Sequence, residues 1–282
     1  MSGTLYLVAT PIGNLEDMTF RAVRILKEVD LICAEDTRNS IKLLNHFDIH
    51  TEMTSYHEFN KYDKGNYLVQ RLQNGDDLAV ITDAGTPGIS DPGEELVAMC
   101  YEAGIEVVAV PGPAAVIAAV TTSGQACRRF AFEAFLPKDK KEHERVLEEM
   151  ERETRTMIVY EAPHHLKKTL EELQSRLGNR SITITKELTK KHEKKWKTTL
   201  DDAVAYYQEN DPRGEYVLVL AGKSKEEVEQ EKQAQWEMLT LSEHMDVYLK
   251  QGLNKKDAMK AVAKDRNVSK RDIYNQLLEE EQ

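Results

Sequence analysis

A twelve-residue loop, Thr82–Gly93, constrains the fold of this chain more than any other stretch. It contains three glycines and two prolines, follows the apolar run Leu78–Ile81 and precedes a helical pattern. Asp91 and Pro92 predict the start of that helix, because an N-cap oxygen followed by a residue without an amide hydrogen suits the first turn. An ordinary strand-to-helix connection needs only about 2–6 residues. The longer, rigid loop therefore favours a ligand-binding role at the end of a strand.

Apolar runs alternate with helical patterns through residues 1–122, which predicts a first α/β domain built on a parallel sheet. Four of these runs end in special segments, at Pro11, Asp36, Asp83 and Pro111. In a parallel sheet the carboxyl ends of the strands meet at one edge, so these segments are expected to share a site.

Two local expectations concern the same domain. Asp17 is placed to cap the first helix. Residues 48–60 are polar and show no periodicity, so we expect a loop or an irregular crossover there.

Residues 123–223 predict a second, smaller α/β domain with more antiparallel pairing. Its apolar runs include Thr156–Tyr160 and Val217–Leu220. Ile182 and Ile184 alternate with threonines, which indicates a half-buried strand. The highly charged residues 224–235 indicate a linker or a solvated helix.

Residues 236–282 predict a helical C-terminal unit with two short helices. Ser269 would cap the second helix, with Asp272 at the third position of a capping-box-like arrangement. Surrounding basic residues, among them Lys270 and Arg271, make the pair similar to a helix-turn-helix that contacts nucleic acid. An almost equally good interpretation is a plain two-helix cap that packs on the body of the protein.

The net charge of −11 argues against a general polyanion-binding protein, so an RNA partner would require a local basic patch. Lys190–Lys197 is such a patch, with five lysines around Trp196. Cations interleaved with an aromatic ring suit phosphate contact and base stacking. A solvated loop is the alternative.

The three cysteines are far apart and no HExxH motif is present, so neither a disulfide framework nor a metal site is predicted. No export signal and no membrane-spanning run is found in the sequence, and we expect a cytoplasmic protein with no membrane partner.

Several nucleotide-site and hydrolase motifs are missing. There is no GxxxxGK[ST] for a nucleoside triphosphatase, no GxGxxG after the first strand and no GxSxG nucleophile elbow. A rigid pocket with few ionisable groups suits a ligand that carries its own reactivity. A sulfonium methyl donor is such a ligand, because it needs positioning more than activation.

A set of short motifs carries a family resemblance. The motifs are Ala9–Leu15, Ala34–Arg38, Asp83–Gly93, Pro111–Pro113, Phe135–Pro137 and Glu187–Lys190. Taken in this order, they resemble the ribosomal RNA small subunit methyltransferase I family of the tetrapyrrole methylase superfamily. The resemblance extends from about Gly3 to Gly222 and includes the helical tail.

The resemblance implies a fold and a function together. The fold is two α/β domains of tetrapyrrole-methylase type with a central cleft, followed by a helical C-terminal unit. The function is transfer of a methyl group from S-adenosylmethionine to the ribose 2′-oxygen of a cytidine in small-subunit (16S) ribosomal RNA. The resemblance further implies a homodimer that acts on ribosomal RNA or on the ribosomal subunit, without a metal.

The resemblance also implies the residues of the donor site. From the first domain these are Pro11, Asp83, Gly85, Thr86, Pro87, Ile89, Ser90, Thr121 and Thr122. Glu161, Leu188 and Ala221 would complete the site from the second domain. Lys186 stands where arginine is more usual in the family, so a bidentate contact is not expected there.

The acceptor hydroxyl is a poor nucleophile unless its proton is removed or its geometry is favourable. Asp36, Arg38 and Glu187 are the candidates for orienting or deprotonating it, although an ion pair or a helix cap explains each of them equally well. The candidates for RNA contact are Lys190, Lys191, Lys194, Lys195, Trp196, Lys270 and Arg271.

Two other functions are compatible with the sequence. One is a methylase of the same fold that acts on a tetrapyrrole or a protein side chain, against which the basic Trp196 segment and the helical tail both count. The other is a non-catalytic RNA-binding protein that uses the terminal helix pair.

Overall fold

The computed structural model describes residues 2–280. The chain divides into two compact units. Of the described residues, 2–151 and 155–221 belong to one unit, which holds both β-sheets, and 152–154 and 222–280 belong to the other. The boundary that the sequence predicts near residue 122, between two α/β domains, stays a prediction.

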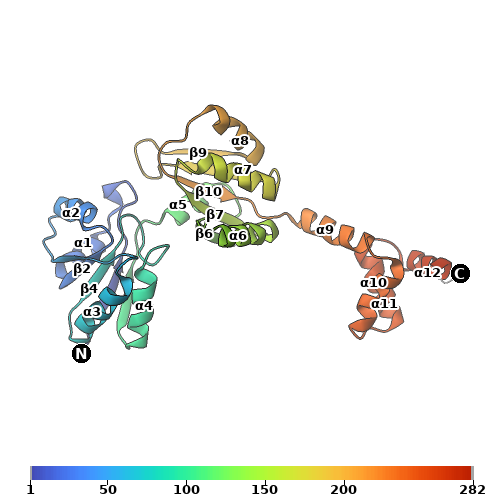
Figure 1. Ribbon diagram of the computed structural model, residues 1–282, viewed down its shortest axis with the longest axis horizontal. Coiled ribbons are helices and arrows are strands. Elements are labelled where there is room, and N and C mark those ends of the chain that lie inside the picture. Colours follow the sequence, from blue (N-terminus) through green and yellow to red (C-terminus); the bar gives the residue numbers. More distant parts are fainter. Residues whose placement is uncertain (1, 281–282) are drawn as a thin grey trace. The chain divides into compact units, whose positions relative to one another are not determined.

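The first sheet is parallel, in the order β3-β2-β4-β1-β5. Its strands are β1 (Thr4–Val8), β2 (Leu31–Ala34), β3 (Met53–Ser55), β4 (Leu78–Ile81) and β5 (Glu106–Val110). Helices α1 (Phe20–Glu28) and α2 (Thr37–His46) bury one face of it. Helices α3 (Lys61–Gln73) and α4 (Gly93–Glu102) bury the other (Figure 1).

Three details of this sheet differ from the sequence-based expectation. Residues 48–60 contain the edge strand β3, which at three residues is too short to show a periodicity. Thr19 rather than Asp17 caps α1, since its side chain accepts a hydrogen bond from the amide of Ala22, and Asp17 ends the short 3₁₀ helix Leu15–Asp17. Helix α4 begins at Gly93, one residue later than expected.

The second sheet is mixed, in the order β6-β7-β10-β8-β9. Only β6 and β7 are parallel to each other, which agrees with the more antiparallel pairing predicted. The strands are β6 (Phe130–Phe135), β7 (Thr156–Glu161), β8 (Ser181–Lys186), β9 (Lys194–Thr199) and β10 (Tyr216–Leu220). Helix α5 (Ala115–Thr122) covers one face. The helices α6 (Lys140–Arg152), α7 (Leu166–Leu177) and α8 (Leu200–Glu209) cover the other.

Two strands of the second sheet depart from their predicted character. Strand β8 is not half-buried: Thr183 and Thr185 lie inside it, and their hydroxyls donate to the carbonyls of Ser123 (2.8 Å) and Val217 (2.9 Å). Burying a hydroxyl group costs little free energy when the group keeps a hydrogen-bond partner. The basic segment predicted around Trp196 contains β9, an edge strand whose charged residues hide its β-character.

The helical unit contains α9 (Lys225–Glu237), α10 (Leu241–Lys250), α11 (Lys255–Asp265) and α12 (Lys270–Glu280). The sequence predicted the last two helices, including the Ser269–Asp272 cap. For the region of α9 it predicted either a linker or a solvated helix. It missed α10, whose Leu241 and Met245 join α11 and α12 in a small core. Within residues 2–280, no helix is both long and apolar enough to cross a bilayer.

A buried polar network links the helices of this unit. His244 is 0% exposed, and its ring stacks on Trp236 at 4.0 Å. Its Nδ1 accepts a hydrogen bond from Arg266 Nε (3.2 Å), and its Nε2 lies 3.3 Å from Asp265. Burial lowers the pKa of His244, against the opposing effect of Asp265.

We expect this network to make the helical unit less stable in mild acid. The neutral ring is favoured in the fold, so the unfolded chain binds the proton more readily once the pH falls below about 6.5. The stabilisation is therefore complete above that pH and is lost as the pH falls through the lowered pKa of His244. Urea denaturation at pH 8 to 5, followed by Trp236 fluorescence in a Trp196→Phe background, measures it. An equal pH dependence in His244→Gln would contradict the assignment.

Candidate functional site

Three loops at the carboxyl ends of parallel strands are interlocked. Thr10 and Gly85 exchange backbone hydrogen bonds of 2.9 and 3.0 Å, which join the loops after β1 and β4. The Thr86 hydroxyl donates to the Pro113 carbonyl (3.0 Å), which joins the loop after β5. Gly85 has φ +89°, a conformation that glycine adopts without strain. The predicted convergence of loops at this edge is thereby explained in atomic terms.

The Asp91 carboxylate holds the long loop from within. It accepts hydrogen bonds from the amides of Gly88 (2.9 Å), Ile89 (3.1 Å) and Gly93 (2.8 Å). It thus fixes the turn before α4 as well as the first amide of that helix, although Pro92 occupies the N-cap position. Pro87 is buried beneath the loop surface.

The second sheet presents a complementary edge. Glu161 at the carboxyl end of β7 is paired with Tyr216 at the start of β10, and Tyr216 is paired with Lys186 at the end of β8. Because β10 runs antiparallel to both neighbours, this edge combines two strand ends with one strand beginning. The chain after Lys186 then carries Leu188 back over the same edge.

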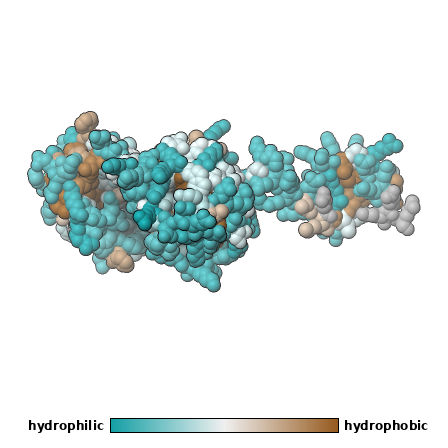
Figure 2. Space-filling view, turned by 90° about the horizontal axis from the view of Figure 1, so that it is seen from above, coloured by the Kyte–Doolittle hydropathy of each residue, from teal (hydrophilic) through white to brown (hydrophobic). Residues whose placement is uncertain are grey.

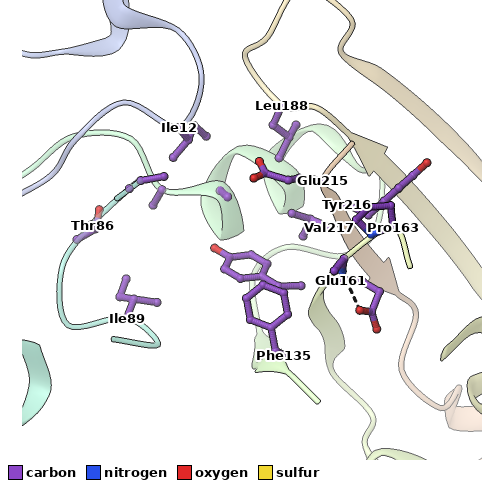
Figure 3. Close-up of a pocket in the computed structure, with 16 residues that line it drawn as sticks. Ile12, Thr86, Ile89, Phe135, Glu161, Pro163, Leu188, Glu215, Tyr216 and Val217 are labelled. Carbon is purple, nitrogen blue, oxygen red and sulfur yellow. Dashed lines mark hydrogen bonds between the residues drawn. The ribbon is translucent and has the colours of Figure 1, made fainter. Parts of the chain in front are cut away.

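A pocket of about 440 Å³ lies between the two sets of loops. Figure 3 shows Ile12, Thr86 and Ile89 on the side of the first sheet and Glu161, Tyr216 and Val217 on the opposite side, with Leu188 facing Ile12 across the top. The lining residues are Ile12, Ala84, Gly85, Thr86, Ile89, Ala114, Ala115, Phe135, Tyr160, Glu161, Ala162, Pro163, Leu188, Glu215, Tyr216 and Val217. The lining is mainly apolar, with few polar groups, as in most small-molecule sites.

Five of the predicted donor-site residues line this pocket: Gly85, Thr86, Ile89, Glu161 and Leu188. Pro11 and Asp83 are next to lining residues without being among them, and neither Pro87 nor Ser90 is among them. The last three predicted residues, Thr121, Thr122 and Ala221, also lie outside the lining.

The topology explains why these last three residues lie outside the pocket lining. Ala221 follows the carboxyl end of β10, whereas the pocket lies at its amino end, five residues or roughly 17 Å away at about 3.3 Å per residue. Thr121 and Thr122 end α5, whose first residue, Ala115, lines the pocket. Their hydroxyls donate to the Ile117 and Ala118 carbonyls of their own helix, each at 2.7 Å.

The sequence missed eleven of the lining residues. Four of them, Ala114, Ala115, Ala162 and Pro163, directly follow strands or Pro/Gly segments, so a strand-end rule applied to every strand would have found them. Glu215, Tyr216 and Val217 lie at the start of a strand, and only knowledge of the antiparallel pairing places them at this edge.

Glu161 is a carboxylate buried at the pocket wall, 7% exposed. Its Oε1 accepts from the amide of Ala162 (2.7 Å) and its Oε2 from the hydroxyl of Thr169 (2.5 Å), as the dashed line in Figure 3 shows for the amide. These two donors fix the orientation of the side chain. In the described part of the chain, no basic side chain pairs with it.

Lys190 ties the turn after β8 to the loop after β1. Its Nζ binds Glu187 Oε1 (3.0 Å) and Glu215 Oε2 (2.8 Å). Its aliphatic stem fills the space beside Gly13, where an added Cβ would come within 2.3 Å of Lys190 Cγ. Lys190 therefore joins the two sides of the pocket through its stem and its charge.

The turn that Lys190 closes has an unusual backbone. Glu187 and Thr189 have φ of +52° and +64°, and Leu188 between them is 8% exposed and faces the pocket. Non-glycine residues held in this region store about 1–3 kcal/mol each and persist only where their surroundings fix them. Here the fixing contacts are the Lys190 ion pairs and the bond from the Glu215 amide to Glu187 Oε1 (2.9 Å).

The carboxylates among the candidate acid–base residues already accept hydrogen bonds from neighbouring groups. Asp36 caps α2 and accepts from the backbone amide, Nε and Nη2 of Arg38, and these hydrogen bonds lower the pKa of Asp36 to about 2. The hydrogen bond from the Glu215 amide likewise lowers the pKa of Glu187. Both carboxylates are held as anions and are weak proton acceptors. At the same sheet edge, burial raises the pKa of Glu35, a residue that the sequence did not single out.

The candidate RNA-contact residues fall into three groups. Lys190 and Lys195 are already paired with glutamates, and the Trp196 ring packs on the second-sheet core and edge-on against Tyr206 at 5.0 Å. Trp196 is therefore used for packing, which leaves less of its ring for a base. Lys191 and Lys194 are exposed and have no acidic partner among residues 2–280. Lys270 and Arg271 begin α12 in the helical unit.

No group of three or more His, Cys, Asp or Glu side chains that could hold a metal ion occurs among the described residues. The carboxylates in the pocket lining are those of Glu161 and Glu215, and Thr86, Tyr160 and Tyr216 add hydroxyl groups.

The fold and this cleft define a class of methylases. A family model described as Tetrapyrrole (Corrin/Porphyrin) Methylases matches residues 4–204. Among solved structures, that of a diphthine synthase has the same fold, with a TM-score of 0.62 and 12% identity over 78% of this chain and 90% of its own.

Closer relatives identify the family within that class. A protein of Halalkalibacterium halodurans named Ribosomal RNA small subunit methyltransferase I is 49% identical, over 97% of this chain and 94% of its own. A protein of Synechocystis sp. with the same name is 47% identical over 98% of each chain. The chain belongs to the ribosomal RNA small subunit methyltransferase I family. Members of this family are S-adenosylmethionine-dependent methyltransferases, and the family, the fold class and the donor expected from the sequence are confirmed.

Proposed function

We propose that this protein transfers a methyl group from S-adenosylmethionine to the ribose 2′-oxygen of a cytidine in small-subunit ribosomal RNA. The observation that carries the proposal is the pocket between two interlocked sets of loops in a chain of this family. Family membership favours it over both alternatives, a tetrapyrrole or protein methylase and a non-catalytic RNA-binding protein.

The pocket suits the donor in size and chemistry. Its volume of about 440 Å³ is typical of small-molecule sites. The apolar side chains of Ile12, Ile89 and Leu188 suit a nucleoside face, and the Glu161 carboxylate suits a ligand with a positive charge. When bound, S-adenosylmethionine supplies a methyl group made electrophilic by the sulfonium. Gly85, Thr86, Ile89, Glu161 and Leu188 would hold it.

The residues of the chain then have to position the acceptor. Asp36, Arg38 and Glu187 are anchored by their own hydrogen bonds, so we assign them an orienting role at the acceptor side. Partial burial raises the pKa of the half-buried Glu35 carboxyl at the same sheet edge, and Glu35 is the candidate for accepting the proton of the acceptor hydroxyl.

Three further features belong to the proposal. The protein acts in the cytoplasm, where its substrate is assembled. It forms a homodimer, for which exposed aromatic side chains such as Phe20 and Phe59, each 98% exposed, offer apolar surface. Figure 2 shows a mostly hydrophilic face with an apolar area over the first α/β part of the chain. Lys270 and Arg271 contact RNA from the helical unit.

The test is methyl transfer from radiolabelled S-adenosylmethionine to small ribosomal subunits that lack the modification, followed by nucleoside analysis. We expect labelled 2′-O-methylcytidine. A label on a base, or no incorporation by protein that binds S-adenosylhomocysteine, would overturn the proposed reaction.

A further inference from the structure

We propose that the exposed lysines of the β8–β9 hairpin, Lys191, Lys194 and Lys197, bind the sugar–phosphate backbone of the RNA beside the nucleotide to be methylated. This inference rests on the proposed function and specifies the surface that receives its substrate. The three residues are called the hairpin lysines.

The hairpin is strongly basic in an acidic protein. Residues 186–197 contain six lysines and two glutamates, an excess of four positive charges, whereas the whole chain carries −11. A local excess against an opposite total concentrates the attraction for a polyanion at one place. RNA phosphates would therefore be drawn to this hairpin in preference to the remaining surface.

Some lysines of the hairpin form ion pairs with glutamates, and others do not. Both glutamates are occupied: Glu187 pairs with Lys190, and Glu193 pairs with Lys195 at 2.6 Å. Lys191 and Lys194 have no acidic partner in the described chain. Lys197 Nζ donates to the Gly124 carbonyl (2.7 Å), a neutral partner that leaves its charge uncompensated.

The hairpin lysines lie directly beyond the pocket wall. Leu188, which lines the pocket, is only three residues before Lys191 in the same turn. Lys194 is paired in register with Lys186 at the pocket end of β8, and Lys197 is paired with Thr183 farther along. The lysines thus begin at the pocket and continue away from it by about 10 Å, at about 3.3 Å per residue between Lys194 and Lys197.

The strand geometry places these charges on both sides of an open edge. Strand β9 is the last strand of its sheet. Lys194 and Lys197 are an odd number of residues apart, so their side chains leave opposite faces of the strand. Lys197 lies on the face of Gly124, next to α5, and Lys194 on the face of Trp196. An extended polyanion lying along the edge would meet a cation on either side.

The competing explanation is that edge lysines only prevent pairing with another chain. That role requires neither the proximity to the pocket nor any effect on RNA. The two explanations therefore predict different results for the same variant.

The test compares two triple variants of the full-length protein that each lose three positive charges. Lys191→Gln/Lys194→Gln/Lys197→Gln removes the hairpin lysines. Arg21→Gln/Lys27→Gln/Lys42→Gln removes exposed cations of α1 and α2 and serves as the control. For each, we measure the KM for small ribosomal subunits at several salt concentrations and the Kd for S-adenosylhomocysteine.

We expect the hairpin variant to raise the KM for subunits about tenfold at moderate salt, with Kd for S-adenosylhomocysteine unchanged. Its salt slope should fall by about 2, since each contact with a single-stranded phosphate contributes about 0.7. The control variant should keep the KM and the slope of the natural protein. If the triple variant does not fold, Lys194→Glu alone should give the same direction of change.

An unchanged KM and salt slope in the hairpin variant would overturn the inference while leaving the proposed function intact. An equal loss in the control variant would also overturn it, because net charge would then be the cause. Failure of the natural protein to methylate subunits would instead count against the proposed function itself.

Discussion

Replacement of Lys190 by methionine is expected to weaken the binding of S-adenosylhomocysteine about tenfold. Methionine keeps an unbranched stem beside Gly13 but leaves the Glu187 and Glu215 carboxylates, 3.0 and 2.8 Å from Nζ, without their shared cation. Hydrogen bonds to charged groups contribute about 1.5–3 kcal/mol, and about 1.4 kcal/mol corresponds to tenfold. The turn at Leu188 would then relax away from the pocket. Calorimetric titration of the full chain measures the change.

Two further variants separate this effect from a general loss of charge. Lys190→Arg retains a cation and should recover most of the affinity. Lys191→Met removes the neighbouring exposed lysine, which has no acidic partner in the described residues. It should leave the affinity for S-adenosylhomocysteine unchanged. Equal Kd values for Lys190→Met and the natural protein would show that the pocket does not depend on this contact.

Replacement of Gly85 by alanine is expected to lower S-adenosylhomocysteine affinity at least tenfold. Gly85 has φ +89°, and an added Cβ would lie 3.4 Å from Ile12 Cγ2, a side chain of the pocket wall. The strain of about 1–3 kcal/mol would be relieved by breaking the paired hydrogen bonds with Thr10, which would separate the loops after β1 and β4. Calorimetry and thermal denaturation together measure the result.

The matched control is Gly104→Ala. Gly104 also has a positive φ, +67°, at the C-terminus of α4, with nothing within 4 Å of an added Cβ. This change should lower the melting temperature through the same kind of backbone strain. It should leave the affinity for S-adenosylhomocysteine unchanged. If both variants lost affinity equally, the loss would reflect global stability rather than the loop.

Most of the fold can be predicted from the sequence, because fully buried strands appear as continuous apolar runs and amphipathic helices show a clear periodicity. Leu78–Ile81 and the helix stripe of Leu166, Leu170 and Leu173 are examples. The missed elements have weak signals for physical reasons. Strand β3 has three residues, and β9 is an edge strand whose exposed lysines conceal its pairing.

The sequence predicts one wall of the pocket better than the other. The wall formed by Gly85, Thr86 and Ile89 follows from one rule, that loops after parallel strands bind ligands. The opposite wall breaks that rule, since Tyr216 enters from the start of an antiparallel strand and Leu188 from a strained turn. Ala221, which the resemblance implied, follows the other end of the antiparallel β10 and lies outside the lining. Strand direction, which requires the pairing partners, decides these positions.

The most direct test of the account is a crystal structure of the full chain with S-adenosylhomocysteine. The account predicts ligand density in the pocket between the two sheets, in contact with Gly85, Thr86, Ile89, Glu161 and Leu188. Ligand density confined to another place on the protein, with this pocket holding only solvent, would contradict the central claim that the cleft is the donor site.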